Sequence, residues 1–434
     1  MNISNVAGLA RARVLSVSAA LLLATPMAYA ADSPSTLSLR QALANTAEVH
    51  PSLQVFSFRE QALTYGVQSA KLRPAFRFST DLENVAGTGE AQSLSGAELT
   101  VSLSSVLELG DKRAARIAFA NSRVNAVAAS RQVAALDLAA DVTARYMRIV
   151  ILNARIDVAR ESRQLARQAV SAVRRRVNAG AAPKPELRRA RAALAEADIE
   201  LHRLLSEKSG ARAALAQFWN ARENEMGAIS GDLFALDTVA DIDVLLNRLE
   251  QNPNVVQFAS RQRVQQAELR LALSASRSDI EWQAGIRRLQ GSQDIGFVAG
   301  FSIPLNSASR NRAAIASAES ALALLPVEQE AALRALQVQL RAFYQRRETN
   351  VAALTSLRKK VVPELKTALF ETRKAYSRGR YSYLERISAR SELIAARKAM
   401  VEAAASAQLA QLEIERLTGE SLLLAELQGG ASYE

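Results

Sequence analysis

The residue types that usually carry enzyme chemistry or metal ligation are scarce in this sequence. It has no cysteine and only two histidines, His50 and His202, and neither has a serine or metal-ligand partner at a useful spacing. Apart from Met1 and Met27 near the N-terminus, Met147, Met226 and Met400 stand alone, so soft-metal coordination has no cluster to use. We therefore predict that the protein is not an enzyme and has no catalytic residues, no cofactor and no metal site.

Composition and charge favour long helices over large mixed cores. The 434-residue chain is 49% hydrophobic but only 5% aromatic, and it is rich in Ala, Arg, Leu and Glu, as helices packed through small side chains are. Its 55 Lys and Arg against 43 Asp and Glu give a net charge of +12, which by itself fits nucleic acid or an anionic membrane. Because acids are interspersed with the basic residues along the chain, we predict no nucleic-acid partner.

The N-terminus has the pattern of a secretory signal peptide. Two arginines precede an apolar run over residues 14–24, and a small-x-small triplet ends at Ala30. The run is too short to span a bilayer, which needs about 20 apolar residues. We predict a signal peptide over residues 1–30, and no later stretch is apolar enough for a spanning helix. Such an exported chain is either soluble in the periplasm or inserted in the outer membrane as β-strands.

The sequence that follows contains two similar halves. Tyr146 and Tyr344 lie 198 residues apart, and Glu186 and Glu385 lie 199 apart. Each half has the same order of patterns: a helix, a β-hairpin, a very long helix, a glycine turn and a further helix. We predict structural repeats over residues 31–240 and 241–420 and a C-terminal tail over 421–434.

The long helices are predicted from apolar residues at 3/4 spacing, which is the pattern of a coiled-coil seam. Each helix would extend about 100 Å at 1.5 Å per residue. We expect a bend or a short break at Pro326 and at Pro363, because proline removes a backbone hydrogen bond from a helix. The hairpins, long helices and final helices are predicted at residues 75–104, 111–178 and 184–219 in the first repeat, and at 279–303, 307–377 and 382–418 in the second.

The two hairpins alternate apolar and polar residues with the period of a β-strand. Each alternating run is about nine residues long, the length that a tilted strand needs to cross a bilayer. A small soluble sheet packed on the helices is the alternative, but export and aromatic residues on one face favour the membrane. Arg77 and Glu281 then face the lumen. The side chains predicted to contact lipid are Phe76, Phe78, Leu99, Val101, Trp282, Phe297 and Phe301.

Four strands are too few to close a barrel. Unpaired strand edges cannot face lipid, and spanning barrels have at least about eight strands. Other copies of the chain must therefore complete the sheet, and three copies supply about twelve strands. We predict a homotrimer.

Together these features resemble the TolC family of outer-membrane efflux channels. A closer similarity to the outer-membrane subunits of cobalt-zinc-cadmium type tripartite RND efflux systems is carried by Glu83, Asn84 and Gly87, and by the run Glu-Leu-Gly-Asp-Lys-Arg at residues 108–113. Val85 and Asp111 stand where members of that group usually have a proline and a second glycine.

The resemblance implies a mainly α fold with a small β part, forming a trimeric tube. Its twelve-stranded barrel would lie in outer-membrane lipid and its helical tunnel would cross the periplasm. The partners implied are a periplasmic adaptor (membrane fusion) protein and an inner-membrane RND pump. The function implied is passive conduction of divalent heavy-metal cations.

The two glycine turns between long helices are the positions of greatest functional interest. Glycine supplies the left-handed conformation that ends a helix, and the resemblance places these turns at the periplasmic entrance. Residues predicted to dock the adaptor are Asn178, Gly180, Ala181, Gly379 and Tyr381. The gate candidates are Tyr376, Arg378, Arg380 and Glu385, with either arginine as an ion-pair partner of Glu385.

Three other functions use parts of the same pattern. A drug-efflux channel and a type I protein-secretion channel would have the same fold and differ in partner and substrate. A soluble periplasmic coiled-coil scaffold would explain the helices but leaves the two amphipathic hairpins without a role.

Overall fold

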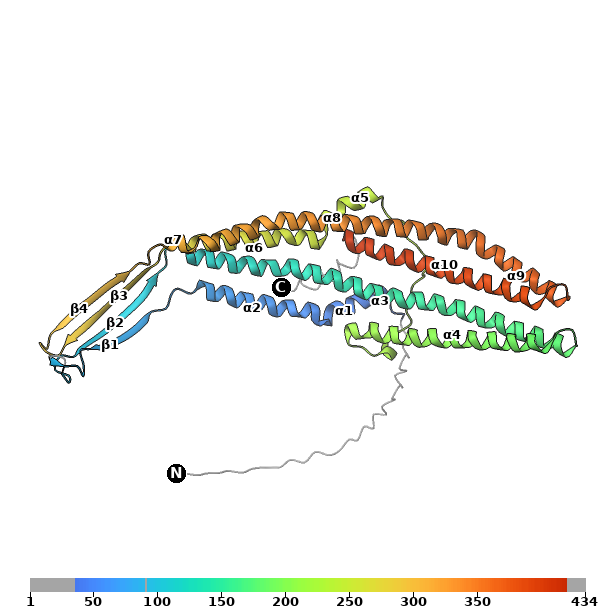
Figure 1. Ribbon diagram of the computed structural model, residues 1–434, viewed down its shortest axis with the longest axis horizontal. Helices are drawn as coiled ribbons and strands as arrows, with labels where there is room; N and C mark the ends of the chain where they lie inside the picture. The colour runs from blue at the N-terminus through green and yellow to red at the C-terminus, as the bar shows by residue number, and fades with distance from the viewer. Residues whose placement is uncertain (1–35, 90–91, 420–434) are drawn as a thin grey trace, which may run out of the picture. The chain divides into compact units, whose positions relative to one another are not determined.

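The structure, a computed structural model, describes residues 36–89 and 92–419. The predicted signal peptide at residues 1–30 and the tail at 421–434 lie outside the described residues. The described part of the chain is mostly helical with one four-stranded antiparallel sheet (Figure 1), which confirms the predicted fold class. Within that part, no helix is long and apolar enough to cross a membrane.

The first half is a chain of two short helices, a β-hairpin and a long helical hairpin. The 67-residue helix α3 buries Val142, Ile149 and Ile156, which recur every seven residues along its apolar seam. The elements are α1 (Leu39–Val49), α2 (Pro51–Lys71), β1 (Arg77–Glu83), β2 (Glu98–Leu107), α3 (Lys112–Asn178) and α4 (Lys184–Ala216).

The second half repeats this order after a connecting segment of short helices. That segment holds η2 (Gln217–Trp219), η3 (Glu223–Glu225), α5 (Ile242–Arg248) and η4 (Leu249–Gln251). The repeat itself comprises α6 (Pro253–Ala275), β3 (Ile280–Leu289), β4 (Ile295–Ser302), α7 (Ser307–Arg310), α8 (Arg312–Ser356), η5 (Leu357–Val361), α9 (Val362–Ser377) and α10 (Tyr383–Thr418).

The two prolines of the second long helix behave differently. Helix α8 continues through Pro326 without a break, so a break at this position is not formed. Before Pro363 the helix widens into the π segment η5, in which the N–H of Val362 donates to the carbonyl of Leu357. A wide turn suits this site because proline has no N–H to donate and its ring crowds the preceding turn.

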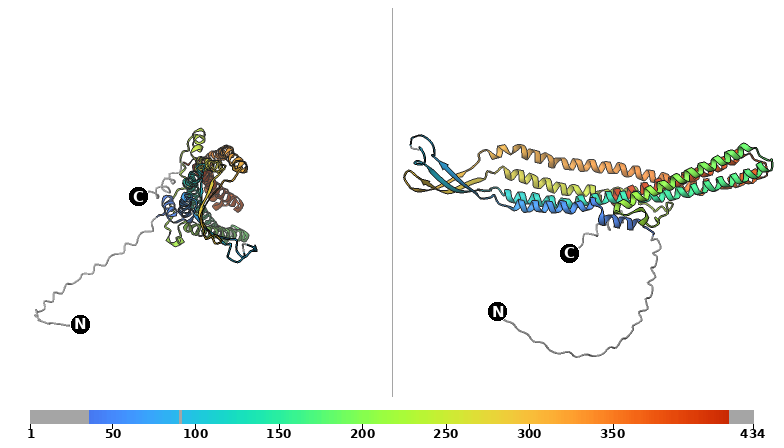
Figure 2. Two further views of the ribbon diagram at one scale, coloured as in Figure 1. Left: turned by 90° about the vertical axis from the view of Figure 1, so that its left-hand side faces the viewer. Right: turned by 90° about the horizontal axis from the view of Figure 1, so that it is seen from below.

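Sheet order is β1-β2-β3-β4, so β2 and β3 join the hairpins of the two repeats. Directly paired residues share a face, and the register places Phe78, Leu103, Ala284 and Ala299 in one row across all four strands. The sheet lies at one end of the helices, and the turns α3–α4 and α9–α10 lie at the other, in Figure 1 and in the right-hand view of Figure 2.

Residues at the base of the hairpins join the sheet to helix α3. The backbone N–H of Leu109 donates to Asp279 at 3.0 Å, and the Lys112 ammonium lies 2.7 Å from the same carboxylate. Gly110 has a φ of +72°, and a Cβ there would lie 2.4 Å from the Arg277 side chain. Asp111 has a φ of +58°, a conformation that Asp tolerates better than most residues. The run at residues 108–113 thus ties the two hairpin bases together.

Small side chains let the helices approach closely in the core. On α10, Ala403, Ala404, Ala405 and Ala407 are all buried. The largest hydrophobic cluster combines the first three of these alanines with residues of α1, α3 and α9. The core therefore lies midway along the helices and holds the two helical hairpins side by side.

Candidate functional site at the helical tips and the sheet

Both helical tips end with the same backbone motif. Gly180 and Gly379 follow α3 and α9 with φ angles of +67° and +77°. In each turn the glycine N–H donates to the carbonyl three residues earlier at 3.1 Å, and the next N–H donates to the carbonyl five residues earlier, at 2.8 and 3.0 Å. This is the Schellman arrangement, which needs a residue that accepts a positive φ.

Tyr376 connects the two tips. Its side chain is 2% exposed, and its hydroxyl donates to the Glu186 carboxylate of the first repeat at 3.1 Å. Arg176 Nη1 donates to the Tyr376 carbonyl at 2.6 Å, and its guanidinium lies 4.5 Å from the ring centroid. Burial, together with the nearby negative charge of Glu186, raises the pKa of Tyr376 to about 12.

Glu385 caps the N-terminus of its own helix, α10. Its carboxylate accepts the Ser382 N–H at 2.6 Å, while its own N–H donates to the Ser382 hydroxyl at 3.3 Å, which forms a capping box. The hydrogen bond from the Ser382 backbone lowers the pKa of Glu385. Within the described chain Glu385 forms no ion pair with Arg378 or Arg380, and both arginines are exposed. Any such pair would have to join two copies.

The role of Glu186 was not foreseen from the sequence, although a local signal exists. Pro183 occupies the position that Ser382 has in the second repeat, 199 residues later. Proline has neither an N–H to donate nor a side chain that accepts a hydrogen bond. Glu186 therefore cannot form the capping box of its counterpart Glu385, and its carboxylate is available to the Tyr376 hydroxyl.

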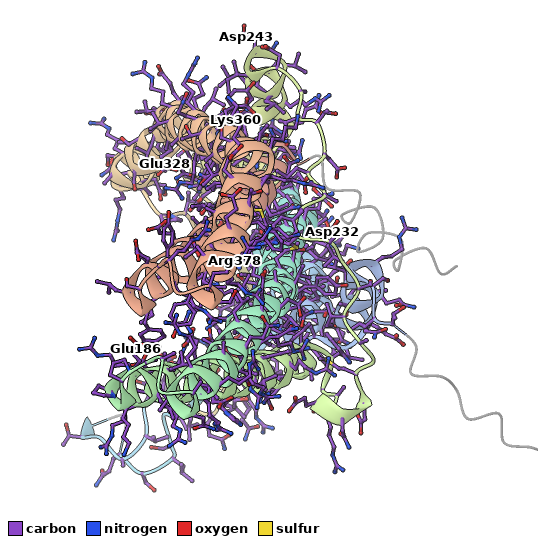
Figure 3. The ribbon with its side chains drawn as sticks, turned by 90° about the vertical axis from the view of Figure 1, so that its right-hand side faces the viewer. Glu186, Asp232, Asp243, Glu328, Lys360 and Arg378 are labelled. Atoms are coloured by element: carbon purple, nitrogen blue, oxygen red, sulfur yellow. The ribbon has the colours of Figure 1, made fainter. Side chains whose placement is uncertain are left out.

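The residues predicted to dock an adaptor lie at the ends of the two hairpins. Asn178 is the last residue of α3. All five residues predicted to dock the adaptor are exposed. Figure 3, which views the molecule from this end, shows Glu186 on the first tip and Arg378 on the second. The set comprises Asn178, Gly180, Ala181, Gly379 and Tyr381.

The strand residues predicted to contact lipid share one face of the sheet. Phe297 and Phe301 are 94% and 79% exposed, and the rings of Phe76 and Trp282 meet edge to face with centroids 6.3 Å apart. The register carries this face across the sheet, and it is the face that also holds Phe78, Leu99 and Val101.

The opposite face of the sheet is polar and ion-paired. Arg287 donates to Glu98 at 2.8 Å and to Thr100 at 2.9 Å, and it lies 3.1 Å from Glu83. The acids of this face, Asp81, Glu83, Glu98 and Glu281, number four against the two arginines Arg77 and Arg287. The face is therefore negative although the whole chain is positive. Among the described residues no group of three or more His, Asp or Glu could hold a metal ion.

Comparison with known proteins shows which class the chain resembles. A model of the outer membrane efflux protein family matches residues 39–221 of this chain. The described chain also has the fold of solved outer-membrane channels. The outer membrane protein VceC of Vibrio cholerae matches with a TM-score of 0.70 at 17% identity, over 88% of this chain and 96% of VceC. CusC matches with a TM-score of 0.72 at 15% identity, over 88% and 91% of the two chains.

Individual relatives are metal-resistance proteins. The chain is 25% identical to the cobalt-zinc-cadmium resistance protein CzcC of Cupriavidus metallidurans over 385 residues, which cover 88% of this chain and 90% of CzcC. It is 25% identical to the nickel-cobalt-cadmium resistance protein NccC of Alcaligenes xylosoxydans xylosoxydans over 332 residues, or 75% and 74% of the two chains. These findings confirm the predicted resemblance and the outer membrane as the location.

Proposed function

We propose that the protein is the outer-membrane channel subunit of a tripartite efflux system. It forms a homotrimer and conducts divalent heavy-metal cations passively, and it receives them from an inner-membrane RND pump and a periplasmic adaptor protein. The observation that carries this proposal is the four-stranded sheet with one apolar and one polar face. This sheet is joined directly to long helical hairpins, in which α3 alone has 67 residues.

Trimer formation follows from the edges of this sheet. β1 and β4 each have one edge that no described strand of the same chain pairs. In lipid, unpaired N–H and C=O groups cost several kcal/mol each, so these edges must pair with other copies. Three copies give about twelve strands, which is a closed barrel of ordinary size.

Cation transport is supported by charge and by the relatives. CzcC is named for resistance to cobalt, zinc and cadmium. NccC is named for resistance to nickel, cobalt and cadmium. The polar face of the sheet carries four acids and two arginines, and three copies would place this negative face around one lumen. Rings of acidic side chains favour cations without a closed ligand set, as a conduit requires.

The closed entrance would be held by contacts between the tips. The Tyr376–Glu186 hydrogen bond joins the hairpins within one chain, and the exposed Arg378, Arg380 and Glu385 would pair between chains. Docking of the adaptor on the exposed turns would compete with these contacts. The docking residues proposed are Asn178, Gly180, Ala181, Gly379 and Tyr381.

A substitution on the apolar face tests insertion in the membrane. Phe297→Arg should cost about 2–4 kcal/mol near mid-bilayer and reduce the yield of trimer in the outer-membrane fraction. Arg77→Ser, on the polar face of the same sheet, is the matched control and should leave the yield unchanged. Equal loss from both variants would mean that the faces have been assigned wrongly.

The substrate is tested in a strain that lacks the gene. We expect growth of this strain to become sensitive to cobalt, zinc or cadmium salts, and expression of the intact chain to restore resistance. Sensitivity to organic drugs alone, with unchanged metal resistance, would instead support a drug-efflux channel.

A further inference from the structure

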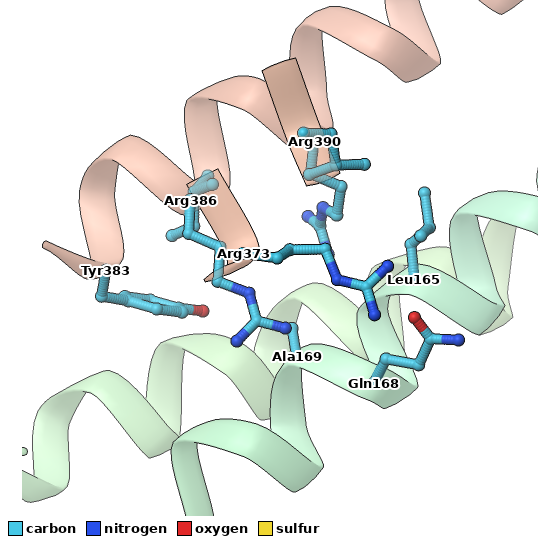
Figure 4. A pocket seen from close by; sticks show the side chains of 9 residues that line it. Leu165, Gln168, Ala169, Arg373, Tyr383, Arg386 and Arg390 are labelled. Atoms are coloured by element: carbon cyan, nitrogen blue, oxygen red, sulfur yellow. The ribbon is translucent and has the colours of Figure 1, made fainter. Parts of the chain in front are cut away.

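Three arginines converge on a small pocket between the two helical hairpins. Arg373 of α9 and Arg386 and Arg390 of α10 line it together with Gln168 of α3. Figure 4 shows the three guanidinium groups close together on the side of α10 that faces α3. No acidic residue lines the pocket, so three positive charges share a space that holds no counter-charge from the described chain.

Arg386 is the most enclosed of the three. Its side chain is 7% exposed, and its neighbour in the structure is the Tyr376 ring, whose centroid lies 5.1 Å from the guanidinium carbon. Burial lowers the pKa of Arg386, and the positive charge of Arg373 lowers it further. A buried charge is costly unless it is paired and hydrogen-bonded. The first turn of α10, where Arg386 lies, adds the positive end of a helix dipole.

Gln168 provides a second, independent observation. Its side-chain oxygen is buried and has no hydrogen-bond partner. An amide turned by half a rotation would present its two N–H donors to the same space. The pocket is partly open to solvent, and its cavity volume is about 10 Å³, which is room for about one water-sized group.

We propose that this pocket binds one compact oxyanion, a phosphate or a carboxylate, with one oxygen inside the pocket and the remaining atoms at its open side. Guanidinium groups present planar pairs of donors that match such oxygens. The anion would join α3 of the first hairpin to α9 and α10 of the second, and so stabilise the packed arrangement of the tips. This site goes beyond the proposed efflux function, because it requires neither a metal substrate nor an adaptor.

Calorimetric titration of inorganic phosphate into the purified full-length trimer in detergent tests the site. Ionic strength is held constant with chloride, so that general screening does not change. We expect saturable binding with one site per chain. Arg386→Gln should weaken binding about tenfold or more, because it removes a charge-assisted hydrogen bond. Arg174→Gln, an exposed arginine of α3 outside the pocket, is the matched control and should bind as the unmodified protein does.

Two further measurements keep the result interpretable. Size-exclusion chromatography and circular dichroism establish that each variant is a folded trimer, and Arg390→Gln replaces a less buried member of the cluster if Arg386→Gln does not assemble. Titration with acetate distinguishes the two anion types: tighter binding of phosphate indicates a phosphate site, and acetate binding as tightly indicates a carboxylate site. Absence of saturable binding by either anion, or equal loss in Arg174→Gln, would overturn the proposal.

Discussion

The two helical tips have the same backbone and different side-chain chemistry. Both turns end a long helix at a glycine with positive φ and with the same pair of hydrogen bonds. The glutamates at the start of the next helix are 199 residues apart, yet Glu385 caps its own helix and Glu186 accepts from Tyr376 of the other repeat. Duplication preserved the scaffold, and one residue before each helix, Pro183 or Ser382, decides which contact its glutamate makes.

Removal of the Tyr376 ring should have the largest effect on this arrangement. Tyr376→Ala deletes a side chain that is 2% exposed, and large-to-small changes at buried aromatic positions cost about 3–5 kcal/mol. We expect the free energy of local opening of α9 to fall by this amount in native-state hydrogen exchange. Tyr381→Ala, in the same tip but 46% exposed, should change it by less than about 0.5 kcal/mol. Similar losses would mean that the ring does not join the tips.

Glu186→Gln should have an intermediate effect. It exchanges a charged acceptor for a neutral one, a difference of about 1 kcal/mol. It should also lower the pKa of Tyr376, which the Glu186 charge helps to raise to about 12. The raised pKa means that Tyr376 stabilises the tips below pH of about 10 and ceases to do so as pH rises towards 12.

Tyrosinate absorbance during alkaline titration measures this change, with Tyr376→Phe to identify the signal. Glu385→Gln is the control, since glutamine also serves in a capping box. It should leave the Tyr376 titration in place. A shift of equal size in both variants would show that the two glutamates are not distinguished as the structure indicates.

Pro183→Ser should have the smallest net effect on stability, because the stabilisation from a new N-cap on α4 is offset by the loss of the Tyr376–Glu186 hydrogen bond. Serine at this position creates the Ser-x-x-Glu pattern of the second tip, and an N-cap contributes about 0.5–2 kcal/mol. The new box would draw Glu186 away from Tyr376. We expect slower hydrogen exchange at the start of α4 and faster exchange at the end of α9. Unchanged exchange at α9 would mean that Glu186 can satisfy both partners.

Helices and strands whose apolar residues recur at a regular spacing could be predicted from the sequence. The long helix expected at residues 111–178 is observed as Lys112–Asn178, and the alternation of the hairpins predicts the face on which Phe297 and Trp282 lie. Contacts between side chains of different helices could not be predicted from the sequence. The Tyr376–Glu186 bond and the arginine pocket depend on how two hairpins pack, and η5 depends on how one helix relieves the strain at Pro363.

The π segment η5 also sets the rotation of everything beyond it. Its wide turn holds one residue more than an α-turn, and an α-helix rotates about 100° per residue. Deletion of one residue between Leu357 and Val361 would therefore turn the outer part of the helix about its own axis by more than a quarter of a circle. Tyr376 would then point away from Glu186, and Arg373 would leave the pocket. A single inserted residue far from the tip thus determines which side chains the second hairpin presents to the first.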